Sequence, residues 1–151
     1  MDLTPGACAT FGDYLVTREE VLEFASKYDP QPFHLDDAAA AANPIFGRLS
    51  ASGWHTCAMV MRMTVDHWAH AQHQVLGAAG VDQIRWLRPV YPGDRLRCKA
   101  VVLEVAPGKP RAGMVMATVE TTTFNQDGVA VMRHIARPMF RDPAASTPAA
   151  A

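Results

Sequence analysis

The 151-residue chain lacks an excess of charge and has no cluster of basic residues. Its 14 Lys and Arg side chains are offset by 15 Asp and Glu, which gives a formal net charge of -1. A protein that binds nucleic acid through the phosphates needs a basic surface to neutralise them. The composition therefore argues against a nucleic-acid partner, although a few arginines are enough to bind a small anionic ligand.

Cysteine is scarce. Cys8, Cys57 and Cys98 are far apart, odd in number and form no C-x-x-C pair. A disulfide framework would require an even and denser set. We therefore expect a reducing compartment and a cytoplasmic protein.

Long apolar runs are also lacking. Residues 1–14 do not show the basic start and apolar stretch of a secretory signal peptide. The most apolar stretch, residues 51–65, is too short to span a bilayer and contains His55 and Arg62. We expect no membrane association.

The length suits a single domain, and no repeat or internal linker divides the chain. We place the domain at residues 1–142. Residues 143–151 are small side chains and prolines, a composition typical of a disordered tail.

The first half of the chain predicts three helices. Residues 17–29 begin with a capping threonine, repeat apolar side chains at helical spacing and end before a proline. Residues 36–44 predict a short alanine-rich helix, and residues 52–70 a longer one that is apolar on nearly all sides. Asp29 thus stands at the negative end of a helix dipole, where an acid is not favoured. Such a placement against local preference is more often functional.

The second half changes to the alternating period of strands. Residues 80–90, 94–105, 114–124 and 129–140 predict strands, and an Asp-Gly turn separates the last two. Helices followed by strands indicate an α+β domain, with an antiparallel meander of about four strands curved around the buried helix. An edge strand would stay open, so we expect a homodimer or a higher homo-oligomer.

The loop between the first two helices holds an acid and an imidazole on a stiff backbone. Asp29 and His34 are separated by Pro30 and Pro32, which restrict the backbone of the segment. A carboxylate can accept a proton from water while a histidine holds the water or passes a proton. The pattern fits water activation, and it also fits a solvated helix cap beside a structural histidine.

Residues 29–56, DPQPFHLDDAAAAANPIFGRLSASGWHT, resemble the hydratase motif of the MaoC-like, or (R)-specific enoyl-CoA hydratase, family of hot-dog folds. The family pattern is D-x-N-P-x-H-x-D, then a short helix with alanine, then F-G-x-x-I-x-H-G. The resemblance implies a single hot-dog domain that acts as a hydratase or dehydratase in fatty acid metabolism. Such an enzyme adds water across the Cα–Cβ double bond of a 2-enoyl-CoA thioester, or removes it.

The resemblance also implies roles for individual residues. Asp29 and His34 become the catalytic pair, and Gly53 becomes a contact for the thioester oxygen. A glycine at a helix N-terminus suits that role, because N–H groups there are unpaired and a substrate can approach closely. Ser52 and Phe33 are further candidates for substrate binding. No metal and no cofactor is implied, since coenzyme A is part of the substrate.

Two positions depart from the family pattern. Gln31 replaces an asparagine beside Pro32, and Ser52 replaces the histidine of the H-G pair. The longer amide of Gln31 can still brace the loop, and Ser52 can cap the helix or line the pocket. Because of these departures, the resemblance predicts the fold more specifically than it predicts the substrate.

Two rival functions stay open. A hot-dog thioesterase would direct water at the thioester carbonyl, but such enzymes usually carry their acid on the central helix, which here has no acid before Asp66. A non-catalytic acyl-CoA-binding domain would hold the same ligand without turnover. Asp29 and His34 are both present, which argues against a domain that has lost its catalytic residues.

Other side chains allow a chemical interpretation, and for most of them we expect a structural one. His67, His70 and His73 are spaced so that they could bind one metal ion, but apart from the nearby Asp66 no carboxylate or cysteine cluster completes the set. Cys57, in the buried helix, is expected to be packed and inert.

Two histidines outside the motif, His55 and His134, are expected to be structural, with their ring nitrogens satisfied. Trp54 could form a pocket wall, but we expect it in the core. Four basic residues are candidate contacts for the coenzyme A phosphates: Arg48, Arg85, Arg88 and Lys109.

Overall fold

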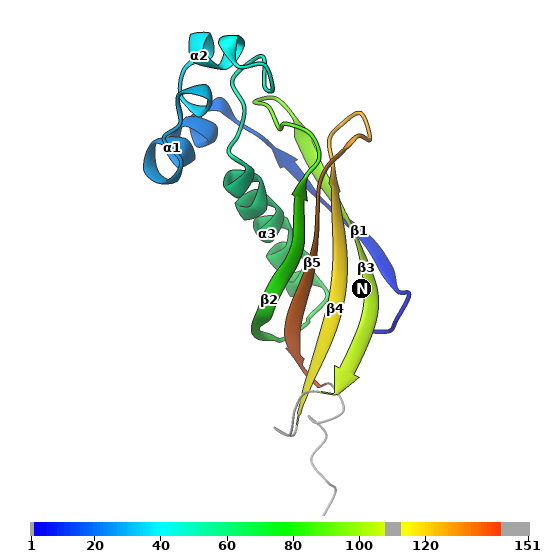
Figure 1. The fold of residues 1–151 in the computed structure, drawn as a ribbon. Helices are drawn as coiled ribbons and strands as arrows, with labels where there is room; N and C mark the ends of the chain where they lie inside the picture. Colours follow the sequence, from blue (N-terminus) through cyan, green and yellow to red (C-terminus); the bar gives the residue numbers. More distant parts are fainter. Residues whose placement is uncertain (1, 108–112, 143–151) are drawn as a thin grey trace, which may run out of the picture.

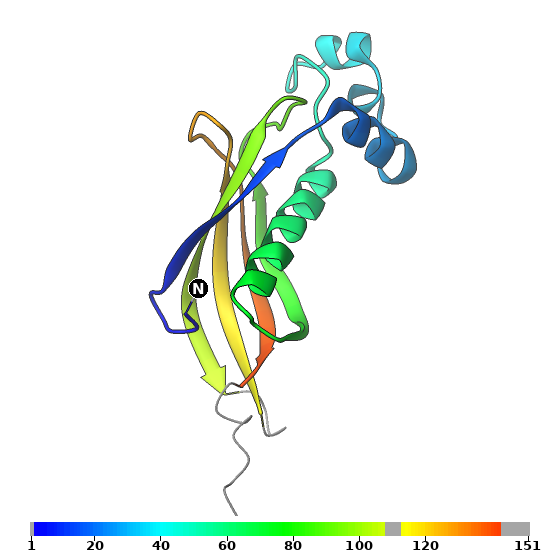
Figure 2. The same ribbon diagram turned by 180° about the vertical axis from the view of Figure 1, so that it is seen from behind.

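A five-stranded antiparallel sheet carries one long helix, α3 (Gly53–His70), along one of its faces (Figure 1). The computed structural model describes residues 2–107 and 113–142. Seen from behind, α3 lies in front of the curved sheet (Figure 2). The α+β architecture, a curved antiparallel sheet against a central helix, is confirmed. The expected tail at residues 143–151 lies outside the described residues.

The strands are arranged in the order β1-β3-β4-β5-β2. Three of the predicted strands become the meander β3-β4-β5, and the Asp-Gly turn between the last two is present, with Gly128 at φ +73°. The bounds are β1 (Cys8–Leu15), β2 (Val75–Trp86), β3 (Arg95–Pro107), β4 (Met114–Phe124) and β5 (Ala130–Arg141).

The sheet differs from the prediction in three respects. The strand predicted at residues 80–90 begins and ends earlier, as β2 at Val75–Trp86. β2 pairs with β5 rather than with β3, because α3 carries the chain across the face of the sheet before β2 begins. The later four strands are therefore not one meander. The additional strand β1 pairs with β3 and contains a register shift between Phe11 and Tyr14, with Gly12 at φ +84°. A bulge of this kind breaks the two-residue period that reveals a strand in sequence.

The helices begin and end close to the predicted positions. Besides α3 they are α1 (Arg18–Tyr28) and α2 (Asp37–Ala42). A side-chain oxygen caps each N-terminus by accepting a backbone N–H, which satisfies one of the unpaired donors of the first turn. These caps are Thr17, Asp36 and Ser52.

The core lies between α3 and the sheet. Met59, Val60 and Met63 of α3 are buried against it. Gly12 of β1 also belongs here, because a Cβ at this position would stand 2.3 Å from the sulfur of Met63. The predicted alternation of β3 is confirmed by its buried side chains: Leu96, Cys98, Ala100 and Val102.

One side of α3 is open in the single chain. Trp54 is 57% exposed, and Met61 and Val65 are each 48% exposed. The expectation that the helix is covered on most sides is therefore wrong for the single chain, and so is the placement of Trp54 in the core. The sheet reaches only one flank of the helix, so the apolar side chains of the other flank stay open.

Both views place α1 and α2 beyond the N-terminal end of α3 (Figures 1 and 2). The segment that carries Asp29 and His34 runs between these two helices. The predicted catalytic loop and the start of the central helix therefore meet at one end of the molecule. Among the described helices, none has both the length and the apolar character needed to cross a membrane.

Candidate active site

The loop between α1 and α2 holds Asp29 in a defined orientation. Asp29 is the C-cap of α1, and its backbone N–H donates to the carbonyl of Ala25. The Gln31 amide donates to Asp29 Oδ1 at 2.7 Å, which is the bracing role expected for this longer side chain. A short 3₁₀ turn, Pro32–His34, then positions the histidine.

The hydrogen bonds of His34 define which ring nitrogen faces Asp29. The residue is 4% exposed, and its Nδ1 lies 2.8 Å from the carbonyl oxygen of Ser50. A carbonyl only accepts, so Nδ1 carries the proton, and Nε2 of the neutral ring presents a lone pair. That nitrogen lies 3.6 Å from Asp29 Oδ2. The distance is too long for a direct hydrogen bond, and a water molecule can bind to both atoms.

Ser52 joins the helix to the acid. Its hydroxyl donates to Asp29 Oδ2 at 2.6 Å and accepts the backbone N–H of Trp54 at 3.2 Å. The residue is fully buried. Ser52 therefore caps α3 and orients Asp29 at the same time, which places it behind the carboxylate.

The environment of Asp29 favours its ionised form. Burial by itself would raise the pKa of this carboxyl group, but hydrogen bonds from Ser52 and Gln31, together with the nearby His34, lower the pKa below the ordinary aspartate value. Donors that bind the charged form act in this direction. Asp29 is thus a carboxylate at neutral pH.

Gly53 begins α3, and its backbone N–H has no acceptor within the described residues. Its carbonyl accepts the indole N–H of Trp86 at 2.9 Å. A Cβ on Gly53 would stand 2.6 Å from the Trp86 ring, so only glycine fits beneath this side chain. The free N–H and the positive end of the helix dipole can stabilise a developing negative charge.

A cavity of about 420 Å³ opens beside these groups. His34, Gly53 and Arg88 are among the residues that line it, together with Phe46 and Trp86. Of the predicted site residues, His34 and Gly53 line this cavity, whereas Asp29, Ser52 and Phe33 do not. Asp29 lies behind His34, and Ser52 is fully buried against Asp29, so it braces the acid and does not face the cavity as expected for substrate binding. The ring of Phe33 stacks on Phe46 with centroids 5.0 Å apart.

Three of the four candidate contacts for the coenzyme A phosphates lie in different surroundings. Arg88 lines the cavity beside His34. The guanidinium of Arg48 lies over the ring of Tyr91, 3.9 Å from its centroid. Arg85 is exposed on β2, and Lys109 lies outside the described residues.

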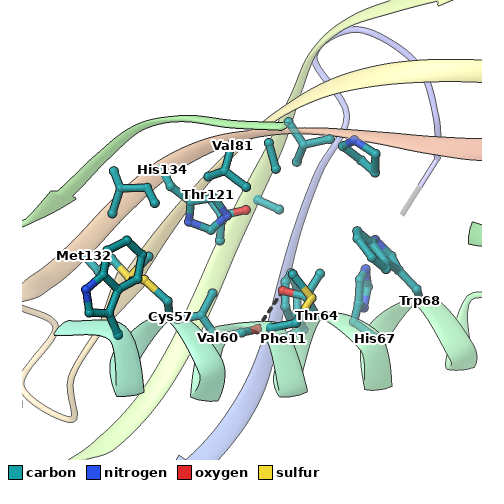
Figure 3. Close-up of a pocket in the computed structure, with 17 residues that line it drawn as sticks. Phe11, Cys57, Val60, Thr64, His67, Trp68, Val81, Thr121, Met132 and His134 are labelled. Carbon is teal, nitrogen blue, oxygen red and sulfur yellow. Dashed lines mark hydrogen bonds between the residues drawn. The ribbon is translucent and has the colours of Figure 1, made fainter. Parts of the chain in front are cut away.

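A second cavity, of about 200 Å³, runs between α3 and the sheet (Figure 3). Its lining is mainly apolar, with Met61 and Val60 from the helix and Val81 from β2. Cys57 also lines it, and burial raises the pKa of this thiol. A raised pKa keeps the sulfur protonated, which agrees with the expected inert role.

The two structural histidines differ from expectation. The Nδ1 atoms of His55 and His134 are buried and have no hydrogen-bond partner among the described residues. His55 stacks on Phe24, and His134 faces the second cavity. Within residues 2–107 and 113–142, no group of three or more metal-ligating side chains is placed to hold an ion.

Two contributors to the site carried no usable sequence signal. The carbonyl of Ser50 sets the tautomer of His34, and a backbone atom has no residue signature. Trp86 covers Gly53 from a strand 33 residues away in the chain. Only the folded sheet brings that ring to the helix.

Comparisons with known proteins agree with this geometry. A family model for the MaoC like domain matches residues 5–125. The 3-hydroxyacyl-thioester dehydratase Z of Mycobacterium tuberculosis is 35% identical over 114 residues, which cover 71% of this chain and 70% of that protein. A MaoC-like dehydratase structure from Rhodospirillum rubrum has a TM-score of 0.82 and 37% identity, covering 94% of this chain and 96% of that chain.

The R-hydratase PhaJ1 from Pseudomonas aeruginosa is a further structural neighbour, with a TM-score of 0.64 and 28% identity. The superposition covers 93% of this chain and 83% of that chain. Family match, relatives and fold point the same way: the chain belongs to the MaoC-like dehydratases, a family of hot-dog hydro-lyases.

Proposed function

We propose that this protein adds water to 2-enoyl-CoA thioesters, or removes it from the corresponding 3-hydroxyacyl thioesters, with Asp29 and His34 as the catalytic pair. The observation that carries the proposal is the 3.6 Å separation between Asp29 Oδ2 and His34 Nε2. His34 lines a cavity together with Gly53, and Asp29 accepts a hydrogen bond from Ser52, the residue before Gly53.

Water activation follows from the two acceptors. A water molecule that donates one hydrogen to the Asp29 carboxylate and one to His34 Nε2 keeps an oxygen lone pair free. That lone pair attacks Cβ of the enoyl group while the carboxylate accepts the proton. His34 holds the water in place or passes the proton, which finally reaches Cα. The elements of one water molecule are then added across the double bond.

The N-terminus of α3 would stabilise the negative charge that forms during the reaction. When the oxygen attacks Cβ, negative charge develops on the thioester oxygen. The N–H of Gly53, at the positive end of the helix dipole, is placed to donate to that oxygen. Hydration transfers no electrons, so the scheme needs no redox cofactor, and the oxyanion contact takes the part of a Lewis acid.

Coenzyme A would be held outside the reacting centre. Arg88 lines the same cavity as His34 and is the candidate for a phosphate contact. An arginine can form two parallel hydrogen bonds to a phosphate group.

The test is turnover of crotonyl-CoA and longer 2-enoyl-CoAs, followed by the loss of enoyl-thioester absorbance and by the release of free thiol. Loss of the conjugated double bond without thiol is the expected result. Release of thiol would indicate a thioesterase. Binding of acyl-CoA without either signal would indicate a non-catalytic domain.

The position of Asp66 argues against the thioesterase alternative. It lies in the fourth turn of α3, where its carboxylate forms an i,i+4 ion pair with Arg62. Asp66 is the one acid of α3, and it does not line the cavity that holds His34. Asp29, which is near it, comes from the loop.

We also propose that the protein is a homodimer or higher homo-oligomer, with a second copy covering the open flank of α3 and the neighbouring part of β2. Trp54 and Met61 of the helix and Val81 of the strand are about half exposed and line the same cavity. Trp86 of β2 meets Trp54 edge to face, with centroids 5.3 Å apart. An exposed apolar surface of this kind is typical of a protein–protein contact.

A further inference from the structure

The cavity between α3 and the sheet has a polar element in its apolar wall. His134 of β5 and Thr121 of β4 are direct register partners, 9% and 4% exposed, and both line the cavity. Figure 3 shows the two side chains on the sheet side of the cavity, across from Cys57 and Val60 of α3. Opposite residues on antiparallel strands have Cβ atoms only about 5 Å apart, so one small group can contact both.

The histidine has unused hydrogen-bonding capacity. His134 Nδ1 is buried without a partner in the described parts of the chain, and Thr121 lines the cavity beside it. Burial lowers the pKa of His134, so the ring is neutral, with one donor and one acceptor nitrogen. A buried polar atom left unpaired is costly, so a bound group that pairs with it gains affinity.

The second cavity lies next to the candidate catalytic centre, with Trp54 and Trp86 between them. Trp86 packs on Gly53, and its register partner on β5 is Met132. His134 lies two residues further along that strand, roughly 7 Å away. The contact between the half-exposed Trp54 and Trp86 separates the two cavities, so an acyl chain bound at Gly53 would enter the second one by parting these rings.

The chemistry of the lining selects the kind of polar group. Among the described residues that line this cavity, none is Arg, Lys, Asp or Glu. A carboxylate on the acyl chain would lose its hydration without gaining a cation, which is strongly unfavourable. A hydroxyl group both donates and accepts, as do the neutral imidazole and the threonine hydroxyl.

We infer that the preferred substrate carries a hydroxyl group on its acyl chain, several carbons beyond the reacting double bond, and that His134 and Thr121 bind this hydroxyl. The inference rests on the proposed function, because it assumes that the thioester binds at Gly53. It adds a specificity-determining pair to the reaction.

The test compares ω-hydroxy-2-enoyl-CoAs with unsubstituted and ω-carboxy-2-enoyl-CoAs of matched length, from about six to about ten carbons. The wild-type protein should favour the hydroxy substrate over the unsubstituted one by at least ~10-fold in kcat/KM at the best length. Thr121→Val and His134→Phe should each bring this ratio close to one. His134→Gln, which keeps a donor and an acceptor, should retain part of it and shows that the fold survives a change at this position.

His55→Phe is the matched control. His55 also has a buried Nδ1 without a partner in the described residues, but it does not line this cavity. The substitution should leave the substrate ratio unchanged. A change as large as that of His134→Phe would mean that the ratio reports general disturbance of the core and would overturn the inference.

The failures of the two proposals can be told apart. Turnover of all enoyl-CoAs without preference for the hydroxyl would mean that water satisfies His134, and only the inference would fall. A preference for the carboxylate would also overturn it. If no enoyl-CoA is turned over, the proposed function falls. Calorimetric Kd values for ω-hydroxy and unsubstituted saturated acyl-CoAs of matched length then test the inference. Tighter binding of the hydroxy compound by at least ~10-fold would support it, and equal Kd values would overturn it.

Discussion

Asp29, the acid of the proposed pair, is held by two hydrogen bonds. Ser52 and Gln31 donate to this carboxylate, which ends a helix, and His34 Nε2 lies 3.6 Å from it. The sequence marks Asp29 as misplaced for a helix end, and the hydrogen bonds explain why it is tolerated there. The stiff loop with two prolines holds the acid and the imidazole at a fixed separation.

Removal of either member of the proposed catalytic pair should abolish most of the activity. Asp29→Asn and His34→Ala are each expected to lower kcat by at least ~100-fold, because the proton acceptors for water are lost. Acyl-CoA binding, measured by calorimetry, should change little. Asp37→Asn is the control, since Asp37 is exposed and pairs with Arg18 away from the cavity. Activity in either pair variant equal to that of the control would contradict the assignment.

Ser52 should set the lower pH limit of activity. Ser52→Ala removes a donor that stabilises the ionised Asp29, so the pKa of this carboxyl group rises. Because the base must be deprotonated, the acid limb of the kcat/KM profile should move to higher pH. The variant also loses a helix cap, which costs about 1 kcal/mol in the free energy of unfolding.

Thr17→Ala separates the two effects of the serine. Thr17 caps α1 but does not contact Asp29. Its loss should lower stability by a similar amount without moving the acid limb. An equal shift of the limb in both variants would attribute the pH effect to stability rather than to the carboxylate.

At the scale of elements, β1 shows how packing can override a local pattern. Gly12 interrupts the strand with a positive φ and brings it against α3. A side chain here would be strained by the backbone and would collide with Met63. The glycine therefore allows the strand and the helix to approach, although it obscures the strand in the sequence.

A glycine pair tests this explanation. Gly12→Ala should lower the free energy of unfolding by at least about 2 kcal/mol in urea denaturation, from strain and overpacking together. Gly6→Ala has the same kind of backbone strain at φ +88°, but nothing lies within 4 Å of its Cβ. It should cost only about 1 kcal/mol. Equal losses would mean that the contact with Met63 contributes nothing.

At the scale of the whole molecule, the open flank of α3 is the main feature that one chain leaves unsatisfied. Apolar side chains of α3 and β2 stand about half exposed next to the cavity that they line. The sequence predicts a helix that is apolar nearly all round, yet the sheet covers one side of it. A second copy is the simplest cover for the other side.

Charge placed on this flank should therefore disrupt the assembly. Met61→Asp is expected to shift the sedimentation behaviour toward the monomer, because the carboxylate would have to be buried in the contact. Leu103→Asp is the control, since Leu103 is similarly exposed, at 46%, on β3. A wild-type protein that sediments as a monomer, or two variants that behave alike, would contradict the proposed interface.

Local sequence determined the helices, three of the strands and the candidate pair. Caps, prolines and periodicity placed the helices, the meander β3-β4-β5 and the loop of Asp29 and His34, because each depends on neighbours in the chain. The motif around them indicated the family. These features need no knowledge of distant contacts.

Only the tertiary structure decided the rest. The pairing of β2 with β5, the indole of Trp86 over Gly53 and the carbonyl of Ser50 on His34 join segments that are distant in sequence. The unpaired nitrogen of His134 is likewise a property of its surroundings. A residue name states which hydrogen bonds a side chain can form, whereas the fold determines which of them are left for a ligand.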